Sequence, residues 1–186
     1  MRRVRCDPAR PDAAVLAEAL AVLSKSGLVV APTDTVYGLL AHPDHPKAID
    51  RIYTLKKRPH DKPLPYLVDS MARLAQLEVE PNREQRDYLS QHWPGATTVL
   101  LTGKDGVKLG LRMPDCPLIL ELIAELGRPL ASTSANPSGK PDTNSAGRLA
   151  GELLDGVDLL LDAGRWGSGR ASTVVDLTTS PFAFLR

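Results

Sequence analysis

The chain has 186 residues, of which 42% are hydrophobic and only 4% are aromatic. This length suits one domain, so we expect residues 1–186 to form a single unit with a core of Leu, Val, Ala and Ile. Lys plus Arg number 23 and Asp plus Glu number 22, which gives a net charge of +1. Nucleic-acid-binding domains usually carry an obvious basic excess, so any anion site must be local.

We expect neither a secretory signal nor a membrane helix in this sequence. The basic start Met1–Arg5 is followed by Asp7 and Pro8 rather than by an apolar h-region. No apolar run approaches the roughly 20 residues of a membrane helix. With only two cysteines, Cys6 and Cys116, a reduced compartment is the simpler interpretation, and one disulfide is the alternative. We expect a soluble cytoplasmic protein.

Hydrophobic periodicity predicts helices that alternate with strands. Asp12 can cap a helix that runs to about Ser26, where Gly27 stops it. Leu28–Ala31 is then predicted as a buried strand that Pro32 ends. Further helices are predicted at Pro46–Lys57, Ser70–Leu77, Arg83–His92, Pro117–Leu126 and Ser145–Leu154. Further strands are predicted at Leu64–Val68, Thr97–Leu101, Leu109–Met113, Leu130–Ser132, Leu159–Leu161, Thr173–Leu177 and Phe182–Leu185.

This order of elements favours an α/β domain. Near the C-terminus the predicted strands follow one another without intervening helices. We therefore expect a mixed sheet with antiparallel edges rather than a purely parallel, doubly wound one.

The first polar segment, Pro32–Leu39, follows a predicted strand, where α/β sheets place their ligands. The hydroxyls of Thr33 and Thr35 and the carboxylate of Asp34 could bind a small polar group. The same residues could instead form a capped turn, with a side chain bonded to its own backbone. The residues alone leave both interpretations open.

The second segment carries four cations in seven residues, Lys56, Lys57, Arg58 and Lys62. Cations at a helix C-terminus complement the helix dipole without any function. Lys62, however, lies beyond the predicted helix in a loop stiffened by prolines. A stiff basic loop favours phosphate binding.

Two further segments have the chemistry of a binding site. Arg112 lies in an otherwise apolar strand, so it either faces solvent, pairs with a protein carboxylate or pairs with a ligand carboxylate. The segment Ser132–Thr143 supplies hydroxyl, amide and lysine donors suited to a nucleotide. It matches neither a Walker loop nor a dinucleotide fingerprint, and a plain surface loop is the alternative.

Seven segments together resemble the threonylcarbamoyl-adenylate synthase family, the YrdC-like proteins. They occur in family order as PTDTVYGLL (32–40), KKRPHDKPL (56–64), HWPGATTVLL (92–101), GLRMP (110–114), PLASTSANPSGKPDT (129–143), DAG (162–164) and STVVDLT (172–178). The resemblance implies an α/β twisted open mixed sheet with flanking helices and a concave, positively lined cavity. It also implies synthesis of threonylcarbamoyl-AMP and pyrophosphate from threonine, bicarbonate and ATP.

The resemblance also implies roles for individual residues. The residues implied for ATP are Lys56, Arg58, Lys62, Ser134, Asn136 and Arg186. The residues implied for threonine are Thr35, Arg112, Ser132 and Ser172, with Arg112 on the amino-acid carboxylate. Mg²⁺ would arrive with ATP rather than on protein ligands, and no organic cofactor is expected. We assign no residue as a general base.

In this family a separate transferase complex passes the product to adenosine in tRNA, so tRNA would not be a direct substrate. The chain departs from the family at Leu67, where some members have a histidine near threonine, and at Ala96, where proline is common. The sequence stops at Arg186, which resembles the members without a linker and second domain. The alternative function is an RNA-binding module of the same fold without synthase activity.

Overall fold

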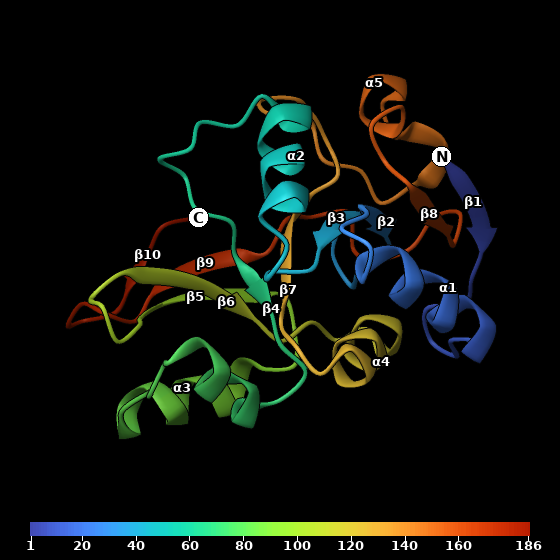
Figure 1. Ribbon diagram of the computed structural model, residues 1–186. Coiled ribbons are helices and arrows are strands. Elements are labelled where there is room, and N and C mark those ends of the chain that lie inside the picture. Colours follow the sequence, from blue (N-terminus) through green and yellow to red (C-terminus); the bar gives the residue numbers. More distant parts are fainter.

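The computed structural model describes residues 1–186 and has a ten-stranded twisted mixed sheet flanked by helices (Figure 1). The strands are β1 (Arg2–Arg5), β2 (Val29–Ala31), β3 (Gly38–Ala41), β4 (Tyr66–Leu67), β5 (Thr97–Thr102), β6 (Lys108–Arg112), β7 (Leu130–Ser134), β8 (Leu159–Asp162), β9 (Thr173–Asp176) and β10 (Ala183–Phe184). Their order across the sheet is β1-β8-β2-β3-β7-β4-β6-β5-β9-β10. The α-helices are α1 (Ala13–Leu23), α2 (Pro46–Lys56), α3 (Arg83–His92), α4 (Pro117–Leu126) and α5 (Gly151–Leu154).

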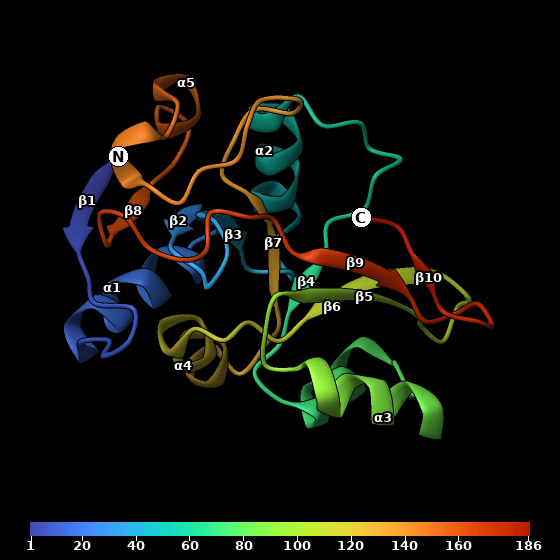
Figure 2. The same ribbon diagram turned by 180° about the vertical axis from the view of Figure 1, so that it is seen from behind.

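The half of the sheet that contains β8, β2, β3 and β7 is covered on both faces. Helices α1 and α4 lie on one side, whereas α2 and α5 lie on the other (Figures 1 and 2). Along β2, Val29 and Ala31 pack into the first cluster and Val30 packs into the second. Successive side chains of a strand point to opposite faces, so burial of both faces requires an uninterrupted apolar strand.

The half that contains β4, β6, β5 and β9 is covered on one face only. Val99 of β5 and Leu111 of β6 pack with Leu89 of α3 in a third cluster. The alternate residues, Leu100 of β5 and Arg112 of β6, therefore point to the face that no helix covers. This open face of the sheet is concave and forms the floor of a cavity, described below.

Two predicted helices coincide with the observed ones because their ends are encoded locally. Helix α3 begins with a capping box, in which the Asn82 side chain accepts from the Gln85 N–H and Gln85 bonds back to Asn82. Helix α4 begins with Pro117 and ends at Gly127, whose φ of 70° lies in the left-handed region.

Two strands were not predicted. The strand Arg2–Arg5 is polar, and it pairs in parallel with β8 while Arg3 forms an ion pair with buried Asp162 at 2.7 Å. The strand Gly38–Ala41 follows the first polar segment directly and pairs antiparallel with β2 and β7. The expected mixed sheet with an antiparallel edge is confirmed, since β9 and β10 pair antiparallel, and antiparallel pairs also occur in the centre of the sheet.

One predicted helix was also wrong. The stretch Ser145–Leu154 contains a 3-10 turn at Ala146–Arg148 and then the single-turn helix α5, rather than one continuous helix. Leu149 and Ala150 separate them in an extended conformation. The stretch predicted as a helix at Ser70–Leu77 is a 3-10 helix at Met71–Leu77.

The two cysteines are free thiols, with Cys116 buried and Cys6 half-buried. Burial, the largest cause, raises the pKa of Cys6 to about 12 and that of Cys116 to about 11. Neither thiol is therefore activated at neutral pH. As for membrane insertion, the helices are all too short or too polar to span a bilayer.

Tyr37 joins segments that are far apart in the sequence. Its hydroxyl donates to the Gly164 carbonyl at 3.1 Å and accepts from the Ala163 N–H at 3.0 Å. The side chain is 1% exposed, so water cannot replace these bonds. This hydroxyl fixes the segment after β8 against the start of β3.

We expect Tyr37→Phe to lower the free energy of unfolding by about 1–3 kcal/mol, because a buried N–H and a buried carbonyl lose their partner. Urea denaturation measures the change. Tyr88→Phe is the matched control, since the Tyr88 ring stacks on His92 but its hydroxyl has no hydrogen-bond partner. An equal loss in the two variants would contradict this role for Tyr37.

Candidate active site

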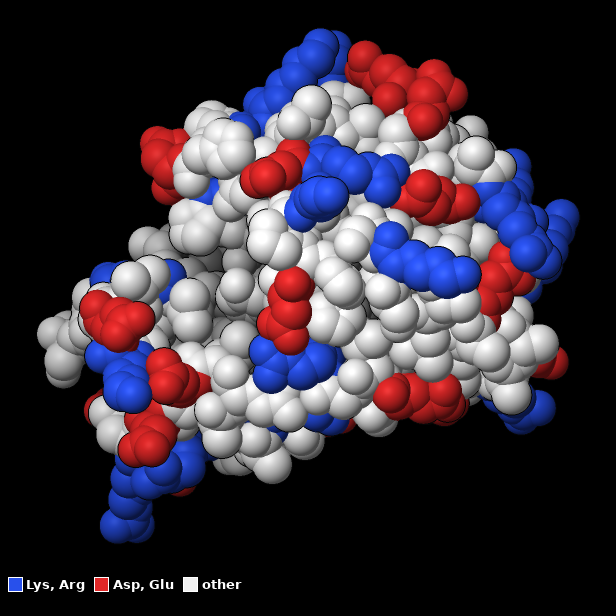
Figure 3. Space-filling model, viewed as in Figure 1, with Lys and Arg blue, Asp and Glu red and all other residues white.

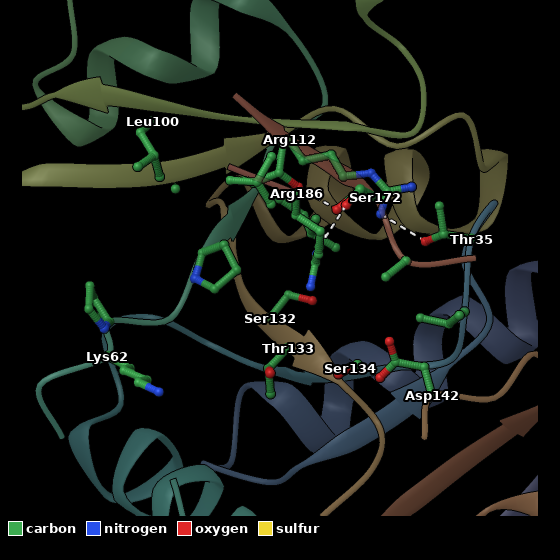
Figure 4. Close-up of a pocket in the computed structure, with 18 of the residues that line it drawn as sticks. Thr35, Lys62, Leu100, Arg112, Ser132, Thr133, Ser134, Asp142, Ser172 and Arg186 are labelled. Atoms are coloured by element: carbon green, nitrogen blue, oxygen red, sulfur yellow. Dashed lines mark hydrogen bonds between the residues drawn. The ribbon is translucent and has the colours of Figure 1, made fainter. Parts of the chain in front are cut away.

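A cavity of about 520 Å³, here called the main cavity, lies over the open face of the sheet (Figure 4). Its cationic lining residues are Arg58, Lys62, Lys108, Arg112 and Arg186, and its acidic ones are Asp61 and Asp142. The main cavity is therefore positively lined, as the resemblance implied. It also contains the four residues expected to bind threonine, Thr35, Arg112, Ser132 and Ser172.

Arg112 is held by three hydrogen bonds on the floor of the main cavity. Its Nε donates to the Gly95 carbonyl at 3.0 Å, its Nη1 to Thr35 Oγ1 at 2.8 Å and its Nη2 to Asp34 Oδ1 at 2.5 Å. Of the three interpretations of this arginine, pairing with a protein carboxylate is confirmed. The guanidinium has more N–H groups than these bonds use, so it can also bind a ligand.

The polar segment after β2 forms a capped turn and also reaches the cavity. Thr33 Oγ1 donates to the Val36 carbonyl at 2.7 Å. Its contact of 2.9 Å with Thr35 Oγ1 must therefore use the Thr35 proton, because a hydroxyl has only one. Thr35 also accepts from Arg112, so toward the cavity it presents an acceptor and favours a ligand group that donates.

A glycine-rich segment after β8 clamps this turn, and the sequence analysis did not identify it. The Ser168 N–H donates to the Asp34 carbonyl at 2.9 Å, and the Gly169 N–H donates to the Thr35 carbonyl at 2.8 Å. Directly before Ser168, Gly167 has φ +83°, and a Cβ there would lie 2.5 Å from the Thr33 carbonyl oxygen. The three glycines at 164, 167 and 169 were the available signal for such a close approach.

Hydroxyl groups form another part of the cavity wall. Ser132 and Ser172 are both buried, and Ser172 Oγ lies 2.8 Å from Thr98 Oγ1. Thr98 was not predicted as a site residue, although it lies two positions from Leu100 on the same face of β5. Arg186 folds back to this wall, where its Nε donates to the Ser172 carbonyl at 3.1 Å.

Lys56 lies behind the wall rather than among the residues that line the main cavity. It is 2% exposed, and its ammonium donates to the carbonyls of Ser134 and Asn136 and to Asn136 Oδ1. Burial lowers the pKa of Lys56 to about 8, with a smaller lowering by Arg58. The expected contact of Lys56 with phosphate therefore does not fit this position, and the side chain instead holds the Ser134–Asn136 backbone.

Ser134 and Asn136 are divided between two neighbouring cavities. Ser134 lines the main cavity, and its hydroxyl donates to Asn136 Oδ1 at 2.6 Å. Asn136 lines a second cavity of about 420 Å³ behind the same loop. The Asn136 amide also donates to the Lys140 carbonyl at 2.5 Å, so it shapes the loop from within.

The basic loop after α2 presents Lys62 to the main cavity. Arg58 donates to the carbonyls of Lys62 at 2.9 Å and Pro63 at 3.0 Å, so it stiffens the loop that it belongs to. The ammonium of Lys62 makes no hydrogen bond within the chain and lies across the cavity from Thr35 (Figure 4). On the side of the molecule that Figure 3 shows, basic and acidic side chains are interspersed and form no large patch of one sign.

Comparison with known protein families agrees with this geometry. Residues 21–186 match the model of the Sua5, YciO and YrdC family, described as "Telomere recombination". The chain belongs to this family. Its members include proteins whose fold is the twisted mixed sheet described above, which confirms the predicted fold class.

Two threonylcarbamoyl-AMP synthases that are similar to this chain differ in length. A threonylcarbamoyl-AMP synthase of Bacillus subtilis is 36% identical, over 86% of this chain and 49% of the relative. The chain thus spans about half the length of that protein. A threonylcarbamoyl-AMP synthase of Chromohalobacter salexigens is 33% identical, over 87% of this chain and 92% of the relative. The crystal structure of Pyrococcus abyssi Sua5 complexed with L-threonine matches with a TM-score of 0.89 and 34% identity, covering 100% of this chain and 56% of that one.

We expect Gly167→Ala to lower the free energy of unfolding by about 1–3 kcal/mol, because it adds a clash to the cost of positive φ. Urea denaturation is the measurement. Gly139→Ala is the matched control, since Gly139 has φ +80° but open space around its Cβ position. The difference between the variants isolates the clash with the Thr33 carbonyl, and identical losses would show that the close approach is unimportant.

Proposed function

We propose that this chain is a threonylcarbamoyl-AMP synthase, which makes threonylcarbamoyl-AMP and pyrophosphate from L-threonine, bicarbonate and ATP. The observation that carries the proposal is one cavity with two kinds of binding chemistry. One side has Arg112 with a set of hydroxyls, and the opposite side has the unpaired ammonium of Lys62. These suit an amino acid and a phosphate chain respectively.

The amino-acid side matches threonine group by group. The free N–H groups of Arg112 suit the carboxylate, and the acceptor of Thr35 suits the donating side-chain hydroxyl. Ser132 and Ser172 offer further hydroxyls, and Leu67 lines the cavity with an apolar surface suited to the threonine methyl group. The apolar residue at position 67 is thus compatible with this substrate.

The opposite side suits the triphosphate of ATP. Lys62 and Arg186 are exposed cations that line the main cavity, and Ser134 offers its hydroxyl nearby. We propose that Mg²⁺ arrives with ATP, because magnesium in nucleotide sites is usually held by the substrate phosphates rather than by a cage of protein ligands. No organic cofactor enters the proposal.

The reaction joins the two substrates inside the cavity. The neutral amine of threonine attacks the carbon of bicarbonate and water leaves, which gives a carbamate. A carbamate oxygen then attacks the α-phosphorus of ATP, and the bond to the oxygen of the β-phosphate breaks to release pyrophosphate. Such a phosphorus centre needs positioning and charge neutralisation more than covalent help, so the cations are the principal catalytic groups. A separate complex would transfer the product to tRNA in the cytoplasm, and tRNA would not be this chain's own substrate.

We expect ATP-dependent pyrophosphate release with L-threonine to exceed that with L-valine at least about 10-fold. The reason is that valine leaves the hydroxyl-binding groups unpaired. A coupled pyrophosphate assay with bicarbonate measures both rates. Equal rates would refute threonine specificity. No release with either amino acid, combined with RNA affinity that falls steeply with salt, would favour the RNA-binding alternative.

Two single variants should separate the two sides of the cavity. Arg112→Lys keeps the charge but loses the planar fork, so it should raise the KM for threonine about 10- to 100-fold and leave that for ATP nearly unchanged. Lys62→Ala should raise the KM for ATP about 10-fold with little effect on threonine. Steady-state titration of each substrate measures the four constants. If Arg112→Lys raised the KM for ATP and Lys62→Ala raised the KM for threonine, the two sides of the cavity would have been assigned to the wrong substrates.

A further inference from the structure

The basic loop after α2, residues 57–65, is shaped by hydrogen bonds within itself. It extends away from the end of α2 before it returns to β4 (Figures 1 and 2). Arg58 donates to the carbonyls of Lys62 and Pro63, and the Lys62 N–H donates to the Pro59 carbonyl at 3.2 Å. These bonds define the shape of the loop, but they do not fix its position relative to the main cavity.

Tyr53, which lies on α2, joins this loop to the rest of the protein. Its hydroxyl donates to the Lys62 carbonyl at 3.1 Å, and its ring stacks on that of His60 with the centroids 4.4 Å apart. The Arg58 N–H also donates to the Tyr53 carbonyl at 2.9 Å. Every hydrogen bond and ring contact that residues 58–63 make outside their own segment therefore ends on Tyr53.

The position of Tyr53 is itself fixed by the core. Its side chain is 9% exposed and belongs to the second cluster, together with Ile52 and Leu64. A buried tyrosine hydroxyl needs a hydrogen-bond partner, and here the partner is the backbone of the residue whose ammonium is free in the cavity. Tyr53 does not line the main cavity, so it acts on a ligand there only through the loop.

The loop would lose its order without these contacts. Lys57, Arg58 and Lys62 carry like charges, and a charged segment that is released from its anchor extends and gains conformational freedom. A phosphate chain that bound to such a loop would have to order it, and the lost freedom would weaken the binding. The contacts of Tyr53 order the loop before the ligand arrives.

We propose that Tyr53 is a positioning residue for phosphate binding. Through the Lys62 carbonyl and the His60 ring, it holds the Lys62 ammonium toward the main cavity. This inference rests on the proposed function, because it takes the phosphate chain of ATP as the ligand of Lys62. Arg112 and the hydroxyl groups of the amino-acid side lie on other elements, so threonine binding does not depend on Tyr53.

The first test is Tyr53→Phe, which keeps the buried ring and removes only the hydroxyl. The KM for ATP should rise about 3- to 10-fold, as expected for the loss of one hydrogen bond, whereas the KM for threonine should change by less than about 2-fold. Calorimetric titration with inorganic tripolyphosphate, without threonine or bicarbonate, should show the same loss as ATP. This probe contains the phosphate chain alone.

The second test concerns the ring stack. His60→Ala changes an exposed side chain and should weaken tripolyphosphate binding about 3-fold or more, whereas His60→Phe restores an aromatic ring and should return the affinity to near that of the wild type. Tyr88→Phe is the matched control, because Tyr88 stacks on His92 in the same way but lies on α3, outside the main cavity. It should leave the affinity for tripolyphosphate unchanged.

The outcomes distinguish this inference from the proposed function. If the wild type binds tripolyphosphate and Tyr53→Phe binds it equally well, the role of Tyr53 is refuted and the synthase proposal stands. Equal losses of ATP and threonine affinity in Tyr53→Phe would show a general loosening of the fold and would also refute it. If the wild type binds neither ATP nor tripolyphosphate, the proposed function falls together with this inference.

Discussion

The buried guanidinium of Arg112 is the interaction on which the arrangement of the site depends. A charged group that is 7% exposed must be paired and hydrogen-bonded. Its partners come from the turn after β2 and from Gly95, so satisfying this one side chain joins the doubly covered half of the sheet to the half with an open face. The ion pair thereby positions the turn, and the turn presents Thr35 to the cavity.

The open face itself follows from strand alternation. Strands β5 and β6 each place one set of residues against α3 and the other set toward the cavity. The second set can be polar or charged because no helix covers it. The glycine-rich segment after β8 completes the wall by packing its backbone where a side chain would not fit. The face of β5 and β6 that no helix covers thus forms the candidate binding site within the same domain.

The sequence predicted those features that local chemistry encodes. The capping box at Asn82 and the proline and glycine around α4 defined two helices, and the polar segments marked the sides of the cavity. The polar strand β1 was not predictable because its arginines form it only through pairing with β8. The burial of Lys56 behind the wall was equally hidden, since carbonyl groups 78 and 80 residues later in the chain bind its ammonium.

The C-terminal residue is itself part of the cavity wall. The carbonyl of Arg186 accepts from Val174 and its Nε donates to Ser172, whereas the N-terminal strand β1 lies at the opposite edge of the sheet. Any polypeptide that follows Arg186 would therefore start beside the main cavity. A tag or label attached at Arg186 would occupy the mouth of the main cavity, whereas one attached to β1 would lie at the far edge of the sheet.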